Sequence, residues 1–229
     1  MVCSAPNIVS ILKTVCIGFS GCLLLLFCSA CSTTRDENKL PYYNTPDFTP
    51  LFINRQQDVE EKINHTISPF SFKDQNGHTI TQQNIEGKIH VANFIFTRCI
   101  SICPTLTKHM KKIQAAFSAQ PDVVLLSYSV TPWMDSIAQL RKYADRFNID
   151  SSQWHLLTGD KNEIYQLARQ AYFAEKDLGF TRDSTEFLHT EHFILVDQNK
   201  RIRGIYNGTL ELEAEQIIKD IGLLLKENL

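Results

Sequence analysis

Two cysteines, Cys99 and Cys103, are separated by three residues, and Pro104 follows directly. The other five cysteines of the chain all precede residue 32: Cys3, Cys16, Cys22, Cys28 and Cys31. Residues four apart on a helix share one face, with Cβ atoms about 5–6 Å apart. The backbone N–H groups at a helix N-terminus also favour a thiolate. Such a pair can form a disulfide after modest adjustment or present two sulfurs to one metal ion, which indicates redox or soft-metal chemistry.

Two structural alternatives would need no function: both thiols could fill core space, or they could form a static disulfide. The position of the pair argues against both, because the apolar run 94–96 meets a proline here in a region that has no other cysteine. A thioredoxin-type oxidoreductase usually has two residues between its cysteines and a cis-proline in the turn before its third core strand. The corresponding turn here, residues 185–192, has no proline and contains His189 and His192. Two thiolates and an imidazole form an open, soft ligand set that suits copper, with zinc as the competitor.

The segments that must position these side chains follow a recognisable order. Residues 70–80 predict a hairpin on the turn Asn76-Gly77. Pro104 suits the first turn of a helix, where a missing N–H costs nothing. The apolar patterns predict strands at 90–96, 123–130, 193–197 and 201–206, and helices at 104–117, 135–147, 161–173 and 211–227. A βαβ unit followed by ββα is the order of a thioredoxin-like fold, so we expect one α/β domain with an N-terminal β-hairpin, spanning residues 67–229.

Residues 1–31 predict an exported leader. The apolar stretch 15–30 follows Lys13, is too short to span a membrane comfortably, and ends in small residues. Ser29-Ala30 before Cys31 is typical of a bacterial lipoprotein signal, which makes Cys31 the predicted lipidated residue. An uncleaved anchor and plain secretion are the alternatives, and all three export the domain. We expect a tether over residues 32–66 and a location in the bacterial cell envelope, anchored to a membrane and facing the periplasm.

Composition excludes one class of partner. The chain is 43% hydrophobic and 21% charged, as is ordinary for a soluble α/β domain. Outside the leader, 22 basic residues face 25 acidic ones, since Lys13 is the leader's only charge. Because no basic footprint is present, we expect no nucleic-acid partner.

These residues together resemble the Sco/SenC family of copper-binding proteins. The matching pieces are the cysteine run with its proline, the strand end 129–132, and the histidine segment that leads into 194–197. The likeness covers roughly residues 68–210. It implies a thioredoxin-like domain that binds copper through Cys99, Cys103 and one histidine. In the family the ligand precedes the aspartate that closes the strand by eight residues, which selects His189 over His192.

The resemblance also implies partners. Family members deliver copper to the binuclear site of cytochrome c oxidase or keep the cysteines of that site reduced. We therefore expect the copper-site subunit of the oxidase, or another envelope cuproprotein, as the partner of a metallochaperone rather than an enzyme. Two alternatives stay open. One is an envelope thiol-disulfide oxidoreductase with Cys99 as nucleophile and Cys103 as resolving thiol, and the other is a copper or redox sensor.

The chain departs from the family pattern at three places. Thr131 and Leu188 stand where members commonly have aspartate, and Ile-Ser-Ile separates the cysteines instead of a Pro-Asp-Ile type of sequence. These changes remove possible support for the histidine and possible partner contacts, whereas Asp135 matches a later acid of the family. Met110 is expected in the core rather than as an additional ligand. Trp133 and Trp154 are expected to be packing or docking residues.

Overall fold

The computed structural model describes residues 39–174 and 190–227, and residues Asp36–Leu229 form one compact unit. The predicted leader, Cys31, Leu188 and His189 lie outside the described residues. No helix within the described ranges is both long and apolar enough to cross a bilayer.

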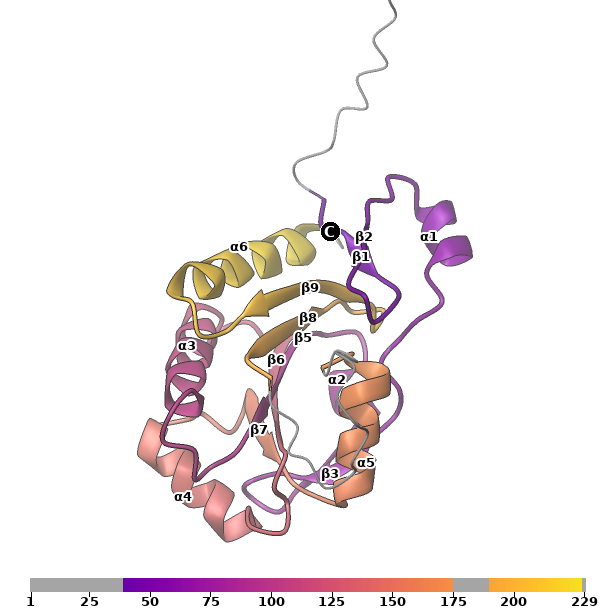
Figure 1. Cartoon of the computed structure of the whole chain (residues 1–229). Helices are drawn as coiled ribbons and strands as arrows, with labels where there is room; N and C mark the ends of the chain where they lie inside the picture. Colours follow the sequence, from indigo (N-terminus) through magenta and orange to yellow (C-terminus); the bar gives the residue numbers. More distant parts are fainter. Residues whose placement is uncertain (1–38, 175–189, 228–229) are drawn as a thin grey trace, which may run out of the picture. The chain divides into compact units, whose positions relative to one another are not determined.

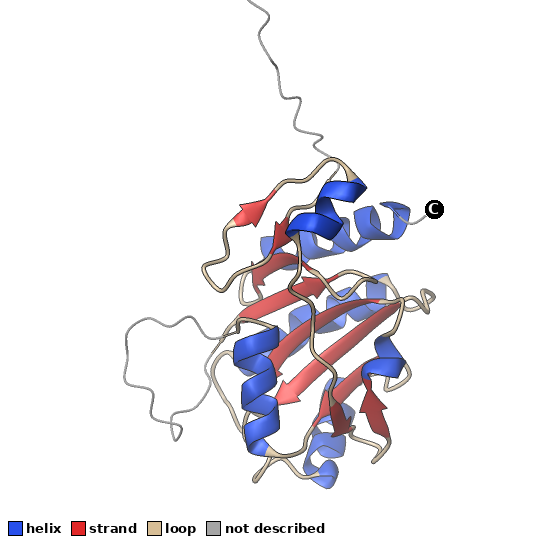
Figure 2. Cartoon of the chain, turned by 90° about the vertical axis from the view of Figure 1, so that its right-hand side faces the viewer, coloured by secondary structure: helices blue, strands red, loops and turns tan. Residues whose placement is uncertain are grey.

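A mixed sheet of seven strands runs through the domain in the order β2-β1-β9-β8-β5-β6-β7 (Figures 1 and 2). Its strands are β1 (Tyr42–Tyr43), β2 (Pro50–Leu51), β5 (Ile89–Ile95), β6 (Val123–Ser129), β7 (Trp154–Leu157), β8 (His192–Val196) and β9 (Ile202–Asn207). Strand β5 pairs in parallel with β6 and antiparallel with β8, and β6 pairs in parallel with β7. The predicted hairpin forms separately from β3 (Ser71–Lys73) and β4 (Thr79–Thr81).

Helices cover both faces of the sheet, as Figure 1 shows. One face carries α3 (Cys103–Ala116), α4 (Ile137–Phe147) and α6 (Glu211–Glu227), and the other carries α2 (Gln82–Ile85) and α5 (Lys161–Gln166), which continues into a π-helix, η1 (Leu167–Ala171). Alternate residues of β5 supply the two cores: Val91 and Ile95 pack with the first group of helices, and Ala92 and Phe94 with the second. The strand is buried along its whole length, which fixes its register against both neighbours.

The thioredoxin-like α/β prediction is confirmed, and its central elements lie within a few residues of their expected bounds. Strand β7 was not predicted, because its four residues are too few to show a period. The predicted Asn76-Gly77 turn is present. Gly77 has φ +83°, a left-handed conformation that glycine adopts without steric cost, and its N–H donates to the carbonyl of Asp74 at 3.0 Å.

The segment expected as a tether is folded from its eighth residue on. Within it lie β1, β2 and α1 (Gln56–Lys62), and Tyr43 pairs with Ile202 at the sheet edge. Tyr42, Val59 and Ile63 form a small apolar cluster of their own. The packed domain therefore begins well before the expected boundary at residue 67. The sequence did not predict these elements, because each is only two to seven residues long and the segment is polar and rich in proline.

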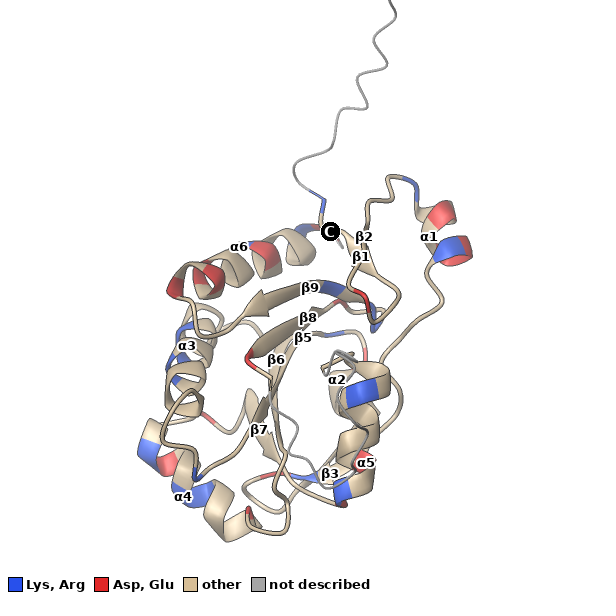
Figure 3. Ribbon diagram, in the orientation of Figure 1, with Lys and Arg blue, Asp and Glu red and all other residues tan. Residues whose placement is uncertain are grey.

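Charged side chains of both signs occur on the described helices, but not evenly: α3 carries lysines and no acid, whereas α6 begins with glutamates (Figure 3). Acidic residues begin α6, where Glu211 pairs with Lys112 of α3.

His90 makes stability depend on pH. Its ring is fully buried on β5, with Nε2 3.1 Å from the hydroxyl of Tyr172, which lies 3.0 Å from that of Tyr128. Burial lowers the pKa of His90 from 6.5 to about 3. The neutral ring thus contributes stability that is complete above pH 6.5 and is lost as the pH falls towards 3.

We expect the free energy of unfolding of the wild type to fall by about 1.4 kcal/mol per pH unit below pH 6 from this group. His90→Gln, which cannot be protonated, should remove that part of the slope, so urea unfolding at pH 7 and pH 5 measures it. Equal pH dependence in the two proteins would contradict the assignment to His90.

Candidate metal and thiol site

The two cysteines lie where β5 leads into α3. Cys99 sits in the turn after the strand, and its N–H donates to the carbonyl of Phe96 at 3.0 Å. Cys103 is the first residue of α3, and Pro104 occupies the first turn as predicted. Only one of the two thiols is therefore on the helix, so their proximity comes from the turn as well as from helical spacing. Both are free thiols in the structure.

The two thiols differ in acidity. Burial acts to raise the pKa of Cys99, but hydrogen bonds from the backbone N–H groups of Cys103 and Ser101 and from the Cys103 thiol outweigh it and lower that pKa. Cys103 is only 6% exposed, and burial raises its pKa to about 12, with the nearby sulfur of Cys99 adding to the shift. The turn thus favours one thiolate, at Cys99, which receives a hydrogen bond from the protonated Cys103.

A fully buried carboxylate, Asp135, holds together the loops around the thiols. It accepts hydrogen bonds from the Thr97 N–H at 3.4 Å, Thr97 Oγ1 at 2.5 Å, Ser129 Oγ at 2.6 Å and Thr131 Oγ1 at 3.0 Å. Thr97 belongs to the turn that follows β5, and Ser129 ends β6. Asp135 therefore fixes the cysteine turn against the neighbouring strand end, and its charge helps to raise the pKa of Cys103.

A second contact reaches the start of α3 from the helix side. Thr107 Oγ1 donates to the carbonyl of Cys103 at 2.8 Å and lies 2.6 Å from the hydroxyl of Tyr143 on α4. Burial raises the pKa of Tyr143 to about 12, and the charges of the two cysteine sulfurs add to the shift. Sequence patterns gave no signal for Thr97, Thr107 or Tyr143, because their roles depend on contacts between distant segments.

The third predicted ligand lies outside the described residues, so the geometry of His189 is not described. Among the described residues, no three cysteine, histidine, aspartate or glutamate side chains gather into a metal-binding group. His192 thus does not join the thiols. His192 is the first residue of β8. Its ring packs edge-on against the ring of Phe48, with the two ring centroids 6.1 Å apart.

The other candidates have structural roles. Met110 is fully buried in the core, and Trp154 is 1% exposed, with Nε1 donating to Ser127 Oγ at 2.8 Å. Trp133, two residues before Asp135 in the sequence, is 55% exposed, and the ammonium of Lys161 lies 5.1 Å from its ring centre. Both tryptophans were expected to be packing or docking residues. Trp154 is a packing residue, and the exposure of Trp133 is compatible with docking.

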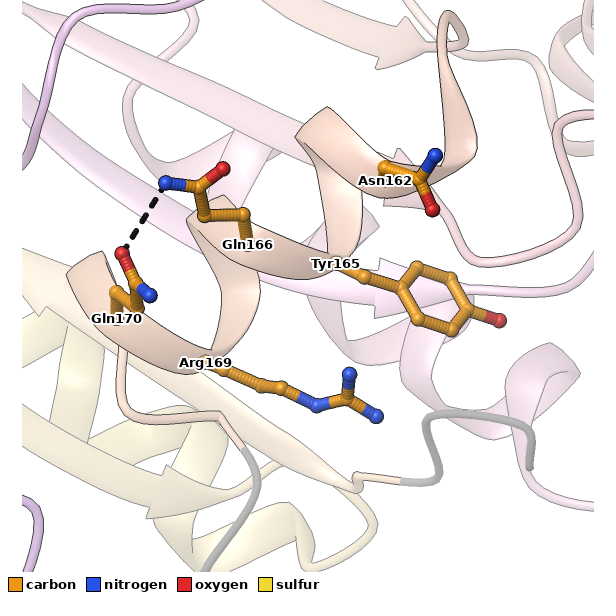
Figure 4. A pocket seen from close by; sticks show the side chains of 5 residues that line it. All are labelled: Asn162, Tyr165, Gln166, Arg169 and Gln170. Atoms are coloured by element: carbon orange, nitrogen blue, oxygen red, sulfur yellow. Dashed lines mark hydrogen bonds between the residues drawn. The ribbon is translucent and has the colours of Figure 1, made fainter. Parts of the chain in front are cut away.

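A separate hollow of about 390 Å³ lies along α5 and η1 (Figure 4). Its described lining is Asn162, Tyr165, Gln166, Arg169 and Gln170. Gln166 donates to Gln170 at 3.3 Å, and the guanidinium of Arg169 lies 5.4 Å from the ring centre of Tyr165. These residues include no thiol, imidazole or carboxylate, so the thiol pair remains the better candidate for chemistry.

The difference in acidity predicts selective alkylation of the reduced protein. At pH 7 a thiol of pKa about 12 is a thiolate in about one molecule in 10⁵, whereas a pKa below 9 gives more than about one in 10². Lower nucleophilicity of the more acidic thiol offsets only part of this ratio. Iodoacetamide should therefore modify Cys99 at least about tenfold faster than Cys103, as followed by peptide mass spectrometry. Equal rates in folded protein would refute the asymmetry.

Comparison with known proteins gives one consistent family. The model of the SCO1/SenC family matches residues 58–226. A SCO1/SenC family lipoprotein from Bacillus anthracis is 30% identical with a TM-score of 0.62, and the match covers 71% of this chain and 96% of that one. A second structure is that of BsSco, a member of the Sco family of cytochrome c oxidase assembly proteins in which a disulfide switch was identified. It is 31% identical with a TM-score of 0.59, and the match covers 71% of this chain and 94% of that one. ScoI of Bradyrhizobium japonicum with copper bound is 25% identical with a TM-score of 0.55, and the match covers 69% of this chain and 99% of that one.

Proposed function

The chain belongs to the SCO1/SenC family, and from that premise we propose that it is an exported copper chaperone that binds copper through Cys99, Cys103 and His189. The observation that carries the proposal is the pair of free thiols at the turn between β5 and α3, in a chain that the family model matches from residue 58 to residue 226. Thiolate and imidazole ligands suit copper. The copper-bound ScoI structure, at 25% identity, supports copper as the cargo.

The sheet topology supports His189 as the third ligand. Strand β8 runs antiparallel to β5. Its first residue, His192, therefore lies at the same end of the two strands as the last residues of β5, where the cysteine turn begins. In the sequence, His189 precedes the first residue of this strand by three positions. His192 is held against Phe48 instead, which favours His189 as the histidine that reaches the thiols.

Copper binding must displace the proton of Cys103, because a metal ligand is the thiolate. The high pKa of this thiol therefore makes the site release a proton on loading and favours copper release when that proton returns. This chemistry fits a carrier that gives up its cargo. We propose the copper-site subunit of cytochrome c oxidase as the recipient, with another envelope cuproprotein as the alternative.

A second function, thiol-disulfide exchange, is favoured by the difference between the two thiols. In this reaction the Cys99 thiolate attacks a partner disulfide and releases one partner thiolate. Cys103 then loses its proton and attacks the Cys99 sulfur of the mixed disulfide. The second partner thiol leaves, and the protein keeps a Cys99–Cys103 disulfide that an external dithiol must reduce. The disulfide switch of BsSco supports this redox reaction of the pair.

The predicted anchor completes the proposal. Cys31 would carry the lipid that ties the folded domain to a membrane of the bacterial envelope on its periplasmic side, as the name of the Bacillus anthracis lipoprotein supports. Acyl chains contribute about 0.8 kcal/mol per buried CH₂, so a multiply acylated cysteine would hold the domain stably.

One titration tests the copper proposal. The reduced full-length protein in detergent receives Cu(II), and the absorption spectrum is followed for sulfur-to-copper charge-transfer bands. We expect the bands to saturate near one equivalent. Insulin reduction without any copper-dependent band would favour the exchange function and refute the chaperone.

A further inference from the structure

Two loops lie side by side at the end of the sheet where the thiols are found. Strands β5 and β6 are neighbours and run parallel, so the segments that follow them, residues 96–102 and 130–136, leave the sheet at the same end. The carboxylate of Asp135 in the second segment accepts hydrogen bonds from Thr97 in the first and so ties the two together. We call these two segments the thiol-edge loops, because the first of them carries Cys99.

Each thiol-edge loop exposes a large apolar side chain. Ile100 is 96% exposed, and Trp133 is more than half exposed. Ile102, two residues after Ile100, instead packs against the apolar core. The loop therefore buries one of its two isoleucines and holds the other in water, directly beside the half-buried Cys99.

The position of these two side chains sets them apart from other exposed apolar residues. Single apolar side chains on a protein surface are ordinary and need no explanation. The others of this size among residues 39–174 and 190–227 lie outside the thiol-edge loops: Phe52, Leu210 and Leu212. Ile100 and Trp133 are on the two loops that Asp135 joins next to a reactive thiol.

The chemistry of Cys99 brings a partner close to Ile100. Both reactions proposed above require a sulfur atom of the partner to reach Cys99. The two Cα atoms of a disulfide are about 4.4–6.8 Å apart, and consecutive Cα atoms of one chain are about 3.8 Å apart. The residues that flank the partner's cysteine therefore come within side-chain reach of Ile100.

The exposed charge of the thiol-edge loops is positive. Arg98 and Asp135 are their charged residues, and Arg98 is exposed whereas Asp135 is fully buried and accepts hydrogen bonds from four donors. Beside Trp133, the ammonium of Lys161 lies 5.1 Å from the centre of the indole ring. Acidic side chains of a partner would complement these cations.

We propose that Ile100 and Trp133 form a docking surface for a partner segment whose reacting cysteine is flanked by apolar side chains, with acidic residues farther out. Apolar side chains of the partner cover Ile100 and Trp133, and the removal of this surface from water stabilises the complex in which a sulfur bond or copper is exchanged. The inference rests on the proposed function, because both reactions place a partner sulfur at Cys99. It adds a rule for which partner segments react fast.

Symmetric peptide disulfides serve as probes. Each joins two identical short peptides through their single cysteines, with glutamate at both ends and either leucine or serine on both sides of the cysteine. The Cys99 thiolate attacks one peptide sulfur, so a Cys99–peptide disulfide forms, the peptide disulfide breaks and one peptide leaves as its thiolate. Cys103 then gives up its proton and attacks the Cys99 sulfur, and the second peptide leaves as a thiol.

The measured quantity is the rate at which reduced Cys99 disappears in the full-length, copper-free protein. Samples are quenched with iodoacetamide, and peptide mass spectrometry separates Cys99 from the leader cysteines. The wild type should react about tenfold faster with the leucine peptide than with the serine peptide. Ile100→Ser and Trp133→Ala should each reduce this preference to about threefold or less.

Two controls separate docking from other effects. Leu212→Ser removes a leucine that is 78% exposed on α6, outside the thiol-edge loops, and should keep the tenfold preference. The rate at which iodoacetamide alone modifies Cys99 should stay within about twofold of the wild type in Ile100→Ser, because this small reagent has no apolar flank. A larger change in that rate would show that the side chain acts on the thiol itself and would overturn the proposal. A wild type without preference, or a preference that survives either substitution in the thiol-edge loops, overturns it as well.

Peptides with lysine instead of glutamate at their ends test the charge of the partner. At low salt the leucine peptide with glutamate ends should react about threefold faster than the one with lysine ends, and the difference should shrink at high salt. Arg98→Gln should also reduce the difference. Equal rates for the two peptides at low salt would overturn the acidic part of the proposal.

The outcomes distinguish this inference from the proposed function. If the wild type reacts with both peptides at the same rate, the docking surface fails and exchange at Cys99 stands. If it reacts with neither peptide, exchange at Cys99 fails and the docking surface fails with it. The copper titration described above then still tests the chaperone function, because it needs no partner.

Discussion

Cys103→Ser should abolish tight copper binding, and Cys99→Ser should do the same. Losing a group that only supports a metal ligand typically costs about 10–100-fold in affinity, so losing a sulfur ligand should exceed 100-fold. A serine hydroxyl would not replace the sulfur, because the proposed site would hold copper through soft thiolates and the hydroxyl is a hard, protonated oxygen. Competition titration with a Cu(I) chelator measures the loss.

Ser101→Ala provides the matched control. It lies between the cysteines and supports Cys99 through its backbone N–H, which alanine retains. We expect its copper affinity to stay within about threefold of the wild type. Affinity within tenfold of the wild type in either cysteine variant would show that the pair is not the metal site.

Asp135→Ala should destabilise the fold by about 3–5 kcal/mol. The carboxylate is fully buried and accepts from one N–H and three hydroxyls, as described above. Each buried donor left without an acceptor costs about 1–3 kcal/mol, and the hydroxyls can recover part of that by turning to other acceptors. Urea unfolding at pH 7 measures the change.

Asp145→Ala on α4 is the control, because Asp145 is exposed and its removal should change stability by about 0.5 kcal/mol or less. The same Asp135 substitution should lower the pKa of Cys103, since the carboxylate charge raises it. Cys103 alkylation in the folded variant should therefore be faster than in the wild type. A loss below about 1 kcal/mol would contradict the role of Asp135 as the centre of this network.

Thr131 illustrates what a departure from the family pattern means physically. It is fully buried, and its hydroxyl donates to Asp135 at 3.0 Å. A carboxylate at this position would place two acids together, whereas the threonine supplies a donor to the one that remains. Thr131 therefore does not disrupt the buried hydrogen-bond network around Asp135, although it lacks the carboxylate that family members commonly have at this position.

The sequence predicted the parts of this structure that depend on local pattern. The buried run of β5, the proline-started helix α3 and the Asn76-Gly77 turn each follow from neighbouring residues. The spacing of Cys99 and Cys103 likewise predicted that the two thiols lie close together, although Cys99 proves to lie in the turn and only Cys103 on α3.

Other features depend on contacts between distant segments and left no local signal. Strand β7 is recognisable only because β6 lies beside it, and the folded segment 39–66 only because β9 offers an edge to pair with. The Asp135 network likewise joins Thr97, in the turn after β5, to Ser129 at the end of β6 and to Asp135 in the segment that follows β6. The physical cause of the unequal acidity of the two thiols also required the turn geometry, because it depends on the burial of Cys103 and on the N–H groups that reach Cys99.

X-ray absorption of the Cu(II)-loaded, full-length protein, compared with His189→Ala, tests the ligand set most directly. We predict a first coordination shell with two sulfur atoms and the outer-shell scattering of one imidazole, and we predict that the imidazole signal disappears in the variant while both sulfurs remain. A shell with fewer than two sulfurs, or an imidazole signal that persists without His189, would contradict the account.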